Sequence, residues 1–243
     1  MLELNVKKKL NSFTLEVNCK LDNNRIGILG GSGAGKSMIL KMIAGIEKPD
    51  SGYIKLDGKL LFDSQKKIDI KPQDRHIGYC FQNYALFPHL SVYENITIGL
   101  DNAGKSLADE FLEKFELTQI KDARPNSISG GQAARVAMAR ILIRKPKVLL
   151  FDEAFSALDI YLRDHIQEEI ASILKDFEGS AIFVSHSRDE IYRLCESMIV
   201  IDSGKITNLG NTKEIFKNPE TKNAAILTGC KNISNIRYID ENT

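Results

Sequence analysis

Short runs of alternating hydrophobic and polar residues dominate the first third of the chain. Between residues 2 and 17 the alternation falls in two bursts around a polar turn, which predicts an antiparallel hairpin. Residues 25–29, RIGIL, form a short apolar run that leads through GGSGAGKS into a stretch of helical periodicity. The next segment carries the turn dipeptide Asp57-Gly58 between alternating apolar residues, so we expect a second hairpin, followed by a strand at residues 77–81.

From about residue 91 to residue 144 the pattern changes to helical periodicity, which predicts a helical insertion. The apolar positions of its first half share one helical face: Leu107, Phe111, Leu112 and Phe115. Apolar strands are then predicted at residues 148–152, 181–186 and 198–202, and a helical stripe over residues 162–177 separates the first two. Short apolar strands that alternate with amphipathic helices favour an α/β fold with a largely parallel sheet covered on both faces.

The end of the domain is expected to close with a hairpin and a short helix. The hairpin is predicted near Ser203-Gly204. The helix is predicted over residues 212–217, with Thr212 as its cap and Pro219 as its stop signal.

Composition narrows the classes of function. The 243 residues carry 33 Lys and Arg against 32 Asp and Glu, so no broad basic surface for nucleic acid is expected. The four cysteines lie far apart without metal-ligand spacing, which argues against a zinc site or a disulfide framework. The N-terminus lacks the apolar core of a signal peptide, and no apolar run reaches the roughly 18 residues of a spanning helix. Any membrane role is therefore expected to come through a partner.

Residues 30–37, GGSGAGKS, match G-x-x-x-x-G-K-[ST] between a predicted strand and a predicted helix. Glycines let successive N–H groups point at an anion, and a helix N-terminus adds partial positive charge. Lys36 would reach the β- and γ-phosphates of a nucleotide, while the Ser37 hydroxyl would bind magnesium. The alternative, a glycine-rich connector without a ligand, is disfavoured by the flanking strand and helix.

Two further segments supply groups that a triphosphate site needs. The apolar run VLLFDE ends in Asp152, which can complete the magnesium shell, and Glu153, which can polarise the attacking water. The segment ISGGQ at residues 128–132 opens a predicted helix and offers a second phosphate receptor. Its placement makes sense if two copies meet head to tail, each offering this helix end to the other's nucleotide. A plain N-cap and turn is the alternative for ISGGQ.

Gln82 and His186 each follow a predicted apolar strand, where a side chain can reach a γ-phosphate or its water. The other three histidines have no comparable placement. We expect His76, His89 and His165 to be structural or solvent-facing.

In this order, GGSGAGKS, CFQNYALFPHL, ISGGQ, VLLFDEAFSALD and VSHSRDE resemble the nucleotide-binding subunit of an ATP-binding cassette (ABC) transporter. The resemblance covers about residues 1–228. It implies a P-loop NTPase (RecA-like) core with an N-terminal antiparallel β-subdomain and an α-helical subdomain at about residues 91–144. It also implies that two copies close around two ATP molecules with Mg²⁺ and hydrolyse them. This ATPase cycle would drive a membrane permease from the cytoplasmic face, with an extracytoplasmic solute-binding protein as an indirect partner.

The resemblance also implies a role for each motif. It makes Glu153 the catalytic base and His186 the switch histidine, and it places Gln82 with Ser37 and Asp152 around Mg²⁺. The residues implied to hold ATP within one subunit are Phe13, Gly30, Gly31, Ser32, Gly33, Ala34, Gly35, Lys36 and Ser37. The residues implied to contact the partner's ATP are Ser129, Gly130, Gly131, Gln132 and Asp159.

Phe13 enters this set because the family usually stacks an aromatic residue of its N-terminal strands on adenine. It is the only aromatic residue among the first 50, and packing in the core is the competing interpretation. Departures from the family pattern are small, with Ile128 where leucine is usual and Ala154 in place of a common proline. Neither removes a phosphate ligand.

The segments FQNYALFPHLSVYENI and DEAFSALD resemble the corresponding segments of importer ATPase subunits, especially those of the molybdate and sulfate group. Uptake of an oxyanion, molybdate or tungstate, is therefore expected. LTGCKNIS at residues 227–234 resembles the start of the C-terminal β-domain of molybdate-type ATPases, and residues 229–243 are otherwise a short tail. The alternatives are an importer ATPase for sulfate, polyamine, iron or sugar, a soluble ABC ATPase outside transport, and a phosphoryl-transferring kinase.

Overall fold

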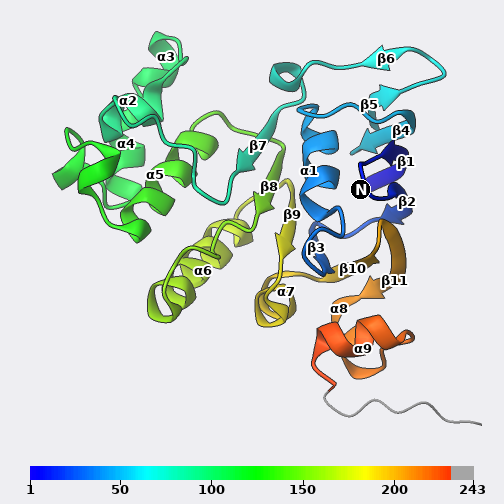
Figure 1. Ribbon diagram of the computed structural model, residues 1–243. Helices are drawn as coiled ribbons and strands as arrows, with labels where there is room; N and C mark the ends of the chain where they lie inside the picture. The colour runs from blue at the N-terminus through cyan, green and yellow to red at the C-terminus, as the bar shows by residue number, and fades with distance from the viewer. Residues whose placement is uncertain (231–243) are drawn as a thin grey trace, which may run out of the picture.

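A computed structural model describes residues 1–230 of the chain. A sheet of 11 strands runs through this part, in the order β6-β5-β4-β1-β2-β11-β10-β3-β9-β8-β7 (Figure 1). Five neighbouring strands pair in parallel and form the predicted parallel core. They are β7 (Ile77–Cys80), β8 (Val148–Asp152), β9 (Ser180–Ser185), β3 (Arg25–Gly30) and β10 (Ser197–Asp202).

The remaining strands extend the sheet beyond β10, in antiparallel pairs except for the parallel contact of β11 with β2, and confirm all three predicted hairpins. They are β1 (Leu2–Lys9), β2 (Thr14–Leu21), β4 (Ser51–Leu56), β5 (Lys59–Asp63), β6 (Ile68–Asp69) and β11 (Lys205–Asn211). Burial alternates residue by residue along β2, as expected for a sheet with one face on the core. The turn between β4 and β5 uses Asp57 and Gly58 at φ of 47° and 80°, and this left-handed conformation suits the Asp-Gly pair.

Helices cover both faces of the parallel core, as predicted. On one face, α1 (Lys36–Ala44) packs in a cluster that includes Val148 and Leu150 of β8. On the other, α5 (Gly130–Leu142), α6 (Ile160–Lys175) and α7 (Arg188–Leu194) pack in a cluster that includes Leu149 and Phe151. Successive side chains of a strand point to opposite faces, so the continuous apolar run of β8 supplies both clusters.

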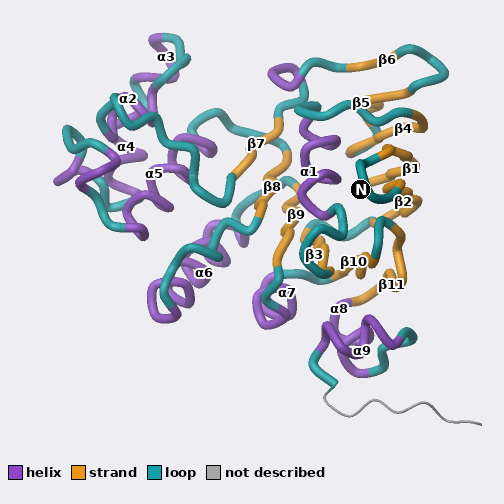
Figure 2. The backbone as a smooth tube through the Cα atoms, viewed as in Figure 1, coloured by secondary structure: helices purple, strands orange, loops and turns teal. Residues whose placement is uncertain are grey.

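The helical insertion lies to one side of the sheet, beyond β7 (Figures 1 and 2). It contains α2 (Val92–Thr97), α3 (Asn102–Lys105), α4 (Ala108–Lys114) and α5, with 3-10 turns η2 (Thr118–Ile120) and η3 (Pro125–Ser127). The predicted apolar face is confirmed, since Leu112 and Phe115 are buried and Leu107 and Phe111 pack against the same cluster. The exact division of the chain into subdomains stays a prediction.

The described part of the chain ends with α8 (Thr212–Lys217) and α9 (Lys222–Thr228). The range expected for α8 is confirmed, but the expected cap is wrong. Asn211, not Thr212, caps α8, since its side-chain oxygen accepts hydrogen bonds from the N–H groups of Lys213 and Glu214 at 3.0 and 3.3 Å. Asn211 has the extended backbone that an N-cap needs, whereas the Thr212 hydroxyl is buried inside the first turn.

Nearly all of the predicted tail, including half of LTGCKNIS, lies outside the described residues. Within residues 1–230, none of the helices is both long enough and apolar enough to cross a membrane.

Candidate active site

The glycine-rich loop follows β3 and packs tightly at its first residue. A Cβ on Gly30 would lie 2.5 Å from the carbonyl oxygen of Ile201, so only glycine fits beside β10 at this position. Ala34 is buried in the core below the loop, whereas residues 31–33 are exposed. The loop is therefore anchored at both ends and open to solvent between them.

The exposed part of the loop carries free hydrogen-bond donors. Gly33 and Gly35 have φ of 74° and 102°, the left-handed conformation that glycine adopts without steric penalty. Among the described residues, the backbone N–H groups of Ser32, Gly33 and Gly35 have no hydrogen-bond acceptor. Such a run of unpaired N–H groups ahead of a helix is a receptor for an anion.

Lys36 places a buried ammonium group at the centre of the site. Its Nζ donates to the carbonyl oxygens of Gly30 and Gly31 at 3.0 and 2.9 Å, and lies 3.4 Å from His186 Nδ1 and 3.9 Å from Glu153 Oε1. Burial lowers the pKa of Lys36, while the carboxylates of Glu153 and then Asp152 act in the opposite direction. The site thus holds one buried positive charge beside the anion receptor.

Glu153 and His186 form the second half of this cluster. His186 Nε2 and Glu153 Oε1 are 2.6 Å apart, and the Glu153 side chain is 17% exposed. Glu153 has a φ of 51°, which costs a non-glycine residue on the order of 1 kcal/mol. Its N–H donates to Val184 O of β9 at 2.9 Å. The parallel pairing of β8 with β9 therefore brings the two side chains together, as their positions after these strands predicted.

The Asp152 carboxylate accepts a hydrogen bond on each of its oxygens. Ser37 Oγ donates to Oδ1 at 2.6 Å, and Tyr79 OH donates to Oδ2 at 2.8 Å. Burial raises the pKa of the Tyr79 phenol, and the neighbouring carboxylate raises it further. Sequence reasoning missed Tyr79. The available signal was a hydroxyl side chain on the strand just before Gln82, which parallel pairing places beside Asp152.

The residues around Asp152 fit a magnesium ion. The side chains of Ser37 and Asp152 meet here, and each offers oxygen. Mg²⁺ prefers a few protein oxygens together with water and phosphate. Within residues 1–230 no group of three or more His, Cys, Asp or Glu side chains forms a metal cage. Gln82 is exposed in the turn after β7, and the described residues give its side chain no hydrogen bond to Ser37 or Asp152. Its predicted place at the metal stays a prediction.

The ISGGQ segment forms the N-terminus of α5, as predicted. Ser129 Oγ accepts from Gln132 N at 3.2 Å and Gln132 Oε1 accepts from Ser129 N at 2.9 Å, a reciprocal capping box. Ser129 and Gly130 are exposed, whereas a Cβ on Gly131 would lie 2.7 Å from Leu162 of α6. Helix α5 and α1 lie on opposite sides of β7 and β8 (Figure 1). One chain therefore does not bring this segment to its own glycine-rich loop.

Asp159 and Phe13 also have local structural roles. Asp159 caps α6, since its Oδ1 accepts from Leu162 N at 3.0 Å. Phe13 is half-buried in the turn between β1 and β2, and a Cβ on Gly204 would lie 2.4 Å from its ring. This close packing is the competing interpretation of Phe13; its contact with adenine stays a prediction.

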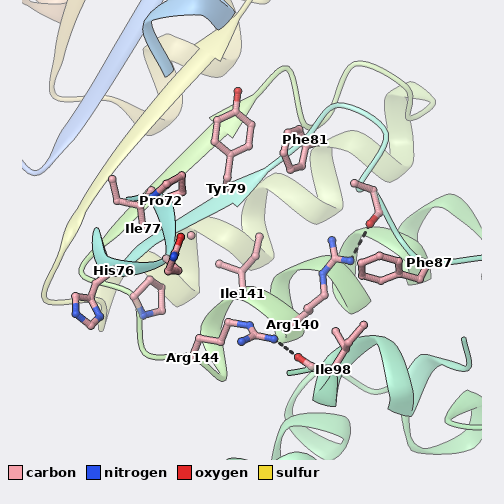
Figure 3. A pocket seen from close by; sticks show the side chains of 14 residues that line it. Pro72, His76, Ile77, Tyr79, Phe81, Phe87, Ile98, Arg140, Ile141 and Arg144 are labelled. Atoms are coloured by element: carbon pink, nitrogen blue, oxygen red, sulfur yellow. Dashed lines mark hydrogen bonds between the residues drawn. The ribbon is translucent and has the colours of Figure 1, made fainter. Parts of the chain in front are cut away.

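A groove of about 670 Å³ separates the parallel core from the helical insertion (Figure 3). Tyr79, His76 and the 3-10 turn η1 (Pro72–Asp74) line its core side. On the helical side, Arg140 donates to the carbonyl oxygens of Ala85 and Tyr84 at 2.8 and 2.6 Å. The two arginine bonds hold the segment after Gln82 against α5.

Comparisons with known proteins agree with this geometry. The family model described as ABC transporter matches residues 11–156, which include the glycine-rich loop, the ISGGQ segment and Asp152. The chain belongs to the ABC transporter family. The cassette is 40% identical over 224 residues to the probable sulfate/thiosulfate import ATP-binding protein CysA of Chlorella vulgaris, covering 88% of this chain and 92% of that protein.

Other relatives of the chain are named for the import of different solutes. The molybdenum import ATP-binding protein ModC of Paramagnetospirillum magneticum is 36% identical, over 90% of this chain and 61% of its own length. The chain therefore spans less than two thirds of that relative. Further relatives are named as Fe(3+) ions import ATP-binding protein FbpC 2, from Haemophilus influenzae, and spermidine/putrescine import ATP-binding protein PotA, from Nitratidesulfovibrio vulgaris.

Solved structures share the fold. CbiO1 from Clostridium perfringens, described as part of the ABC transporter complex CbiONQ, aligns with a TM-score of 0.76 and 28% identity over 90% of this chain and 91% of its own. The ATP-binding cassette MJ0796, described as a dimer in a post-hydrolysis state bound to ADP and Pi, aligns with a TM-score of 0.71 and 26% identity over 87% of this chain and 99% of its own. The α/β fold predicted from the sequence is thus confirmed as that of an ABC cassette.

Proposed function

We propose that the chain binds and hydrolyses ATP. The observation that carries this proposal is the cluster of Lys36, Glu153 and His186 beside a loop with unpaired N–H groups. A buried ammonium and free backbone donors suit a polyphosphate. A carboxylate that is hydrogen-bonded to an imidazole suits the activation of water.

The proposed reaction is attack of water on the γ-phosphorus of ATP. Glu153 takes a proton from the water molecule while the oxygen of that water forms a bond to the γ-phosphorus. The bond between the γ-phosphorus and the β,γ-bridging oxygen breaks, which leaves ADP and phosphate. His186 orients the Glu153 carboxylate through its bond to Oε1. Lys36 offsets negative charge on the β- and γ-phosphates. The strained backbone of Glu153 supports a functional role, since strain of this kind gathers at active sites.

Ser37 and Asp152 are the residues proposed to hold Mg²⁺. When bound, the ion would neutralise charge on the β- and γ-phosphate oxygens. The support is that the two side chains already meet at one point, with 2.6 Å between Ser37 Oγ and Asp152 Oδ1.

The second phosphate receptor is proposed to act on the nucleotide of another copy. Ser129 and Gly130 are exposed at the N-terminus of a 13-residue helix, and they lie away from the chain's own glycine-rich loop. In the capping box the Ser129 oxygen accepts a hydrogen bond, which leaves its hydroxyl proton free to donate to a phosphate oxygen. Gly131, Gln132 and Asp159 would support this helix end.

The cassette is proposed to power an importer from the cytoplasmic face of the membrane. Its permease would dock through a cytoplasmic segment at the groove beside residues 83–94, and an extracytoplasmic solute-binding protein would deliver the solute. Relatives named for import of molybdenum and of sulfate support an oxyanion, and molybdate or tungstate remains the proposed solute. Uptake of iron or a polyamine is the alternative that other relatives support.

Phosphate release by the purified chain tests the proposed ATPase. The wild type is expected to release phosphate from ATP with Mg²⁺ and to lose this activity in EDTA. His186→Ala should turn over at least about 100-fold more slowly, because Glu153 loses the group that orients it. His165→Ala is the matched control, since His165 is 60% exposed on α6 and Glu169 is its one polar partner among the described residues. Equal rates for His186→Ala and His165→Ala would contradict the proposed role.

Purification of the intact complex from native membranes tests the proposed solute. The solute-binding protein that accompanies the permease should bind molybdate or tungstate, as measured by elemental analysis and calorimetry. Binding of iron or a polyamine instead would remove the oxyanion proposal and leave the ATPase proposal in place. Absence of any permease would contradict the proposed transport role.

A further inference from the structure

The two hydrogen bonds on Asp152 are made to different oxygens. Ser37 donates to Oδ1 and Tyr79 donates to Oδ2. Ser37 belongs to the pair proposed to hold Mg²⁺, so metal binding would replace its bond to Asp152. The bond from Tyr79 does not depend on Oδ1 and can persist when the metal is present.

The position of Tyr79 is fixed by strand pairing and by ring packing. Tyr79 stands opposite Leu150 in the parallel pair of β7 and β8, two residues before Asp152 in β8. Its ring packs on Phe81 with centroids 4.3 Å apart, and against the core cluster that contains α1. A phenol held in this way has little freedom to turn, so its hydroxyl gives Asp152 a rigid partner.

The same side chain lines the groove between the core and the helical insertion. Its hydroxyl points away from Arg140 and Arg144, which lie on the helical side of the groove (Figure 3). Tyr79 is thus part of the groove wall, and its hydroxyl reaches Asp152. Replacement of Tyr79 by Phe removes the contact to Asp152 and leaves this part of the groove wall in place.

We propose that Tyr79 is a positioning residue that orients the Asp152 carboxylate for Mg²⁺ through its hydroxyl. The inference rests on the proposed ATPase function. Without the hydroxyl, Asp152 keeps its charge but loses its second anchor, so a metal ion must order a freer carboxylate. The effect should therefore appear in metal dependence and not in the binding of nucleotide alone.

The test compares Tyr79→Phe with wild type by calorimetric titration of ATP over a series of Mg²⁺ concentrations. The Mg²⁺ concentration for half-maximal effect should rise about tenfold, as expected for loss of one hydrogen bond to a charged acceptor. ATP affinity in EDTA should stay unchanged, and kcat should recover at high Mg²⁺. Tyr53→Phe is the matched control, because Tyr53 lies on β4 and its hydroxyl has no hydrogen bond among the described residues.

A double-mutant cycle separates positioning from general packing. In an Asp152→Asn background, Tyr79→Phe should have no further effect on Mg²⁺ dependence, because the charged acceptor is already gone. The proposal would be overturned if Tyr79→Phe showed the same Mg²⁺ dependence as wild type. It would also be overturned if Tyr79→Phe lost as much ATP affinity in EDTA as it loses with Mg²⁺. If wild type itself neither binds nor hydrolyses ATP with Mg²⁺, the proposed function fails, an outcome distinct from a silent Tyr79→Phe variant.

Discussion

Arg75 connects the C-terminus of α1, the helix that begins in the glycine-rich loop, to the rest of the core. Its guanidinium donates to the carbonyl oxygens of Met42 and Ile43 at 2.9 and 2.7 Å, and to Ile70 O at 2.7 Å. It also pairs with Asp69 at 3.2 Å, and its side chain is 1% exposed. A buried cation at a helix C-terminus also interacts favourably with the helix dipole. We predict that Arg75→Met strongly destabilises the fold.

The expected loss follows from what the substitution leaves behind. Methionine fills much of the aliphatic volume but donates no hydrogen bond, so two buried carbonyl groups and one partly buried carbonyl group lose a charged partner. Removal of one partner from a buried charged network costs about 3–5 kcal/mol. For a chain of this size, about 3 kcal/mol corresponds to a fall in melting temperature of roughly 6–12 °C.

Thermal unfolding followed by circular dichroism measures this loss, with urea midpoints as a second measure. Arg25→Met is the matched control, because the Arg25 side chain is 36% exposed and pairs with Glu196 at 3.1 Å on the surface. That exposed pair is expected to contribute no more than about 1 kcal/mol. An Arg75→Met protein as stable as Arg25→Met would refute the assignment of Arg75 as an anchor of α1.

Two further predictions concern single groups. Lys36→Ala should weaken ATP binding at least about tenfold in calorimetry, because it removes the buried charge beside the loop, and unchanged affinity would refute that role. Burial raises the pKa of Glu190 from 4.5 to about 7, an effect that the hydrogen bond from Ser185 only partly opposes. The folded state therefore holds a proton that the unfolded state releases between about pH 4.5 and 7, so stability falls as pH rises through that window. Glu190→Gln should remove this pH-dependent loss of stability. The change in stability caused by the substitution should therefore be more favourable at pH 8 than at pH 4, by up to about 3 kcal/mol. Urea midpoints that shift equally at both pH values would contradict this.

The proposed catalytic cluster could be predicted because parallel strands end at one edge of a sheet. Asp152, Glu153 and His186 each stand at or just after the end of an apolar strand, and β8 and β9 are neighbours in the sheet. The glycine-rich loop likewise follows β3, which pairs with β9. Motif spacing and the ends of apolar strands are local properties, so the sequence carries them directly, whereas the strand order, with β3 between β9 and β10, joins segments far apart in the chain.

Contacts that depend on tertiary packing could not be predicted in the same way. Tyr79 looked like any aromatic strand residue until pairing placed its hydroxyl on Asp152. No pattern in the sequence pointed to Arg75, although its side chain is buried against α1. The choice of Asn211 over Thr212 as a cap depended on a backbone angle that two adjacent polar residues do not distinguish.

The central claim is that ATP is hydrolysed between two copies of the chain. It is tested most directly by the mass in solution of the Glu153→Gln variant, measured with and without ATP. Glutamine keeps the shape of Glu153 but cannot take a proton from water, whereas Ser37 and Asp152 remain for Mg²⁺. Light scattering should show a monomer of 27.2 kDa without nucleotide and about twice that mass with ATP, together with loss of phosphate release. A variant that binds ATP but stays monomeric, or that still turns over at the wild-type rate, would contradict the account.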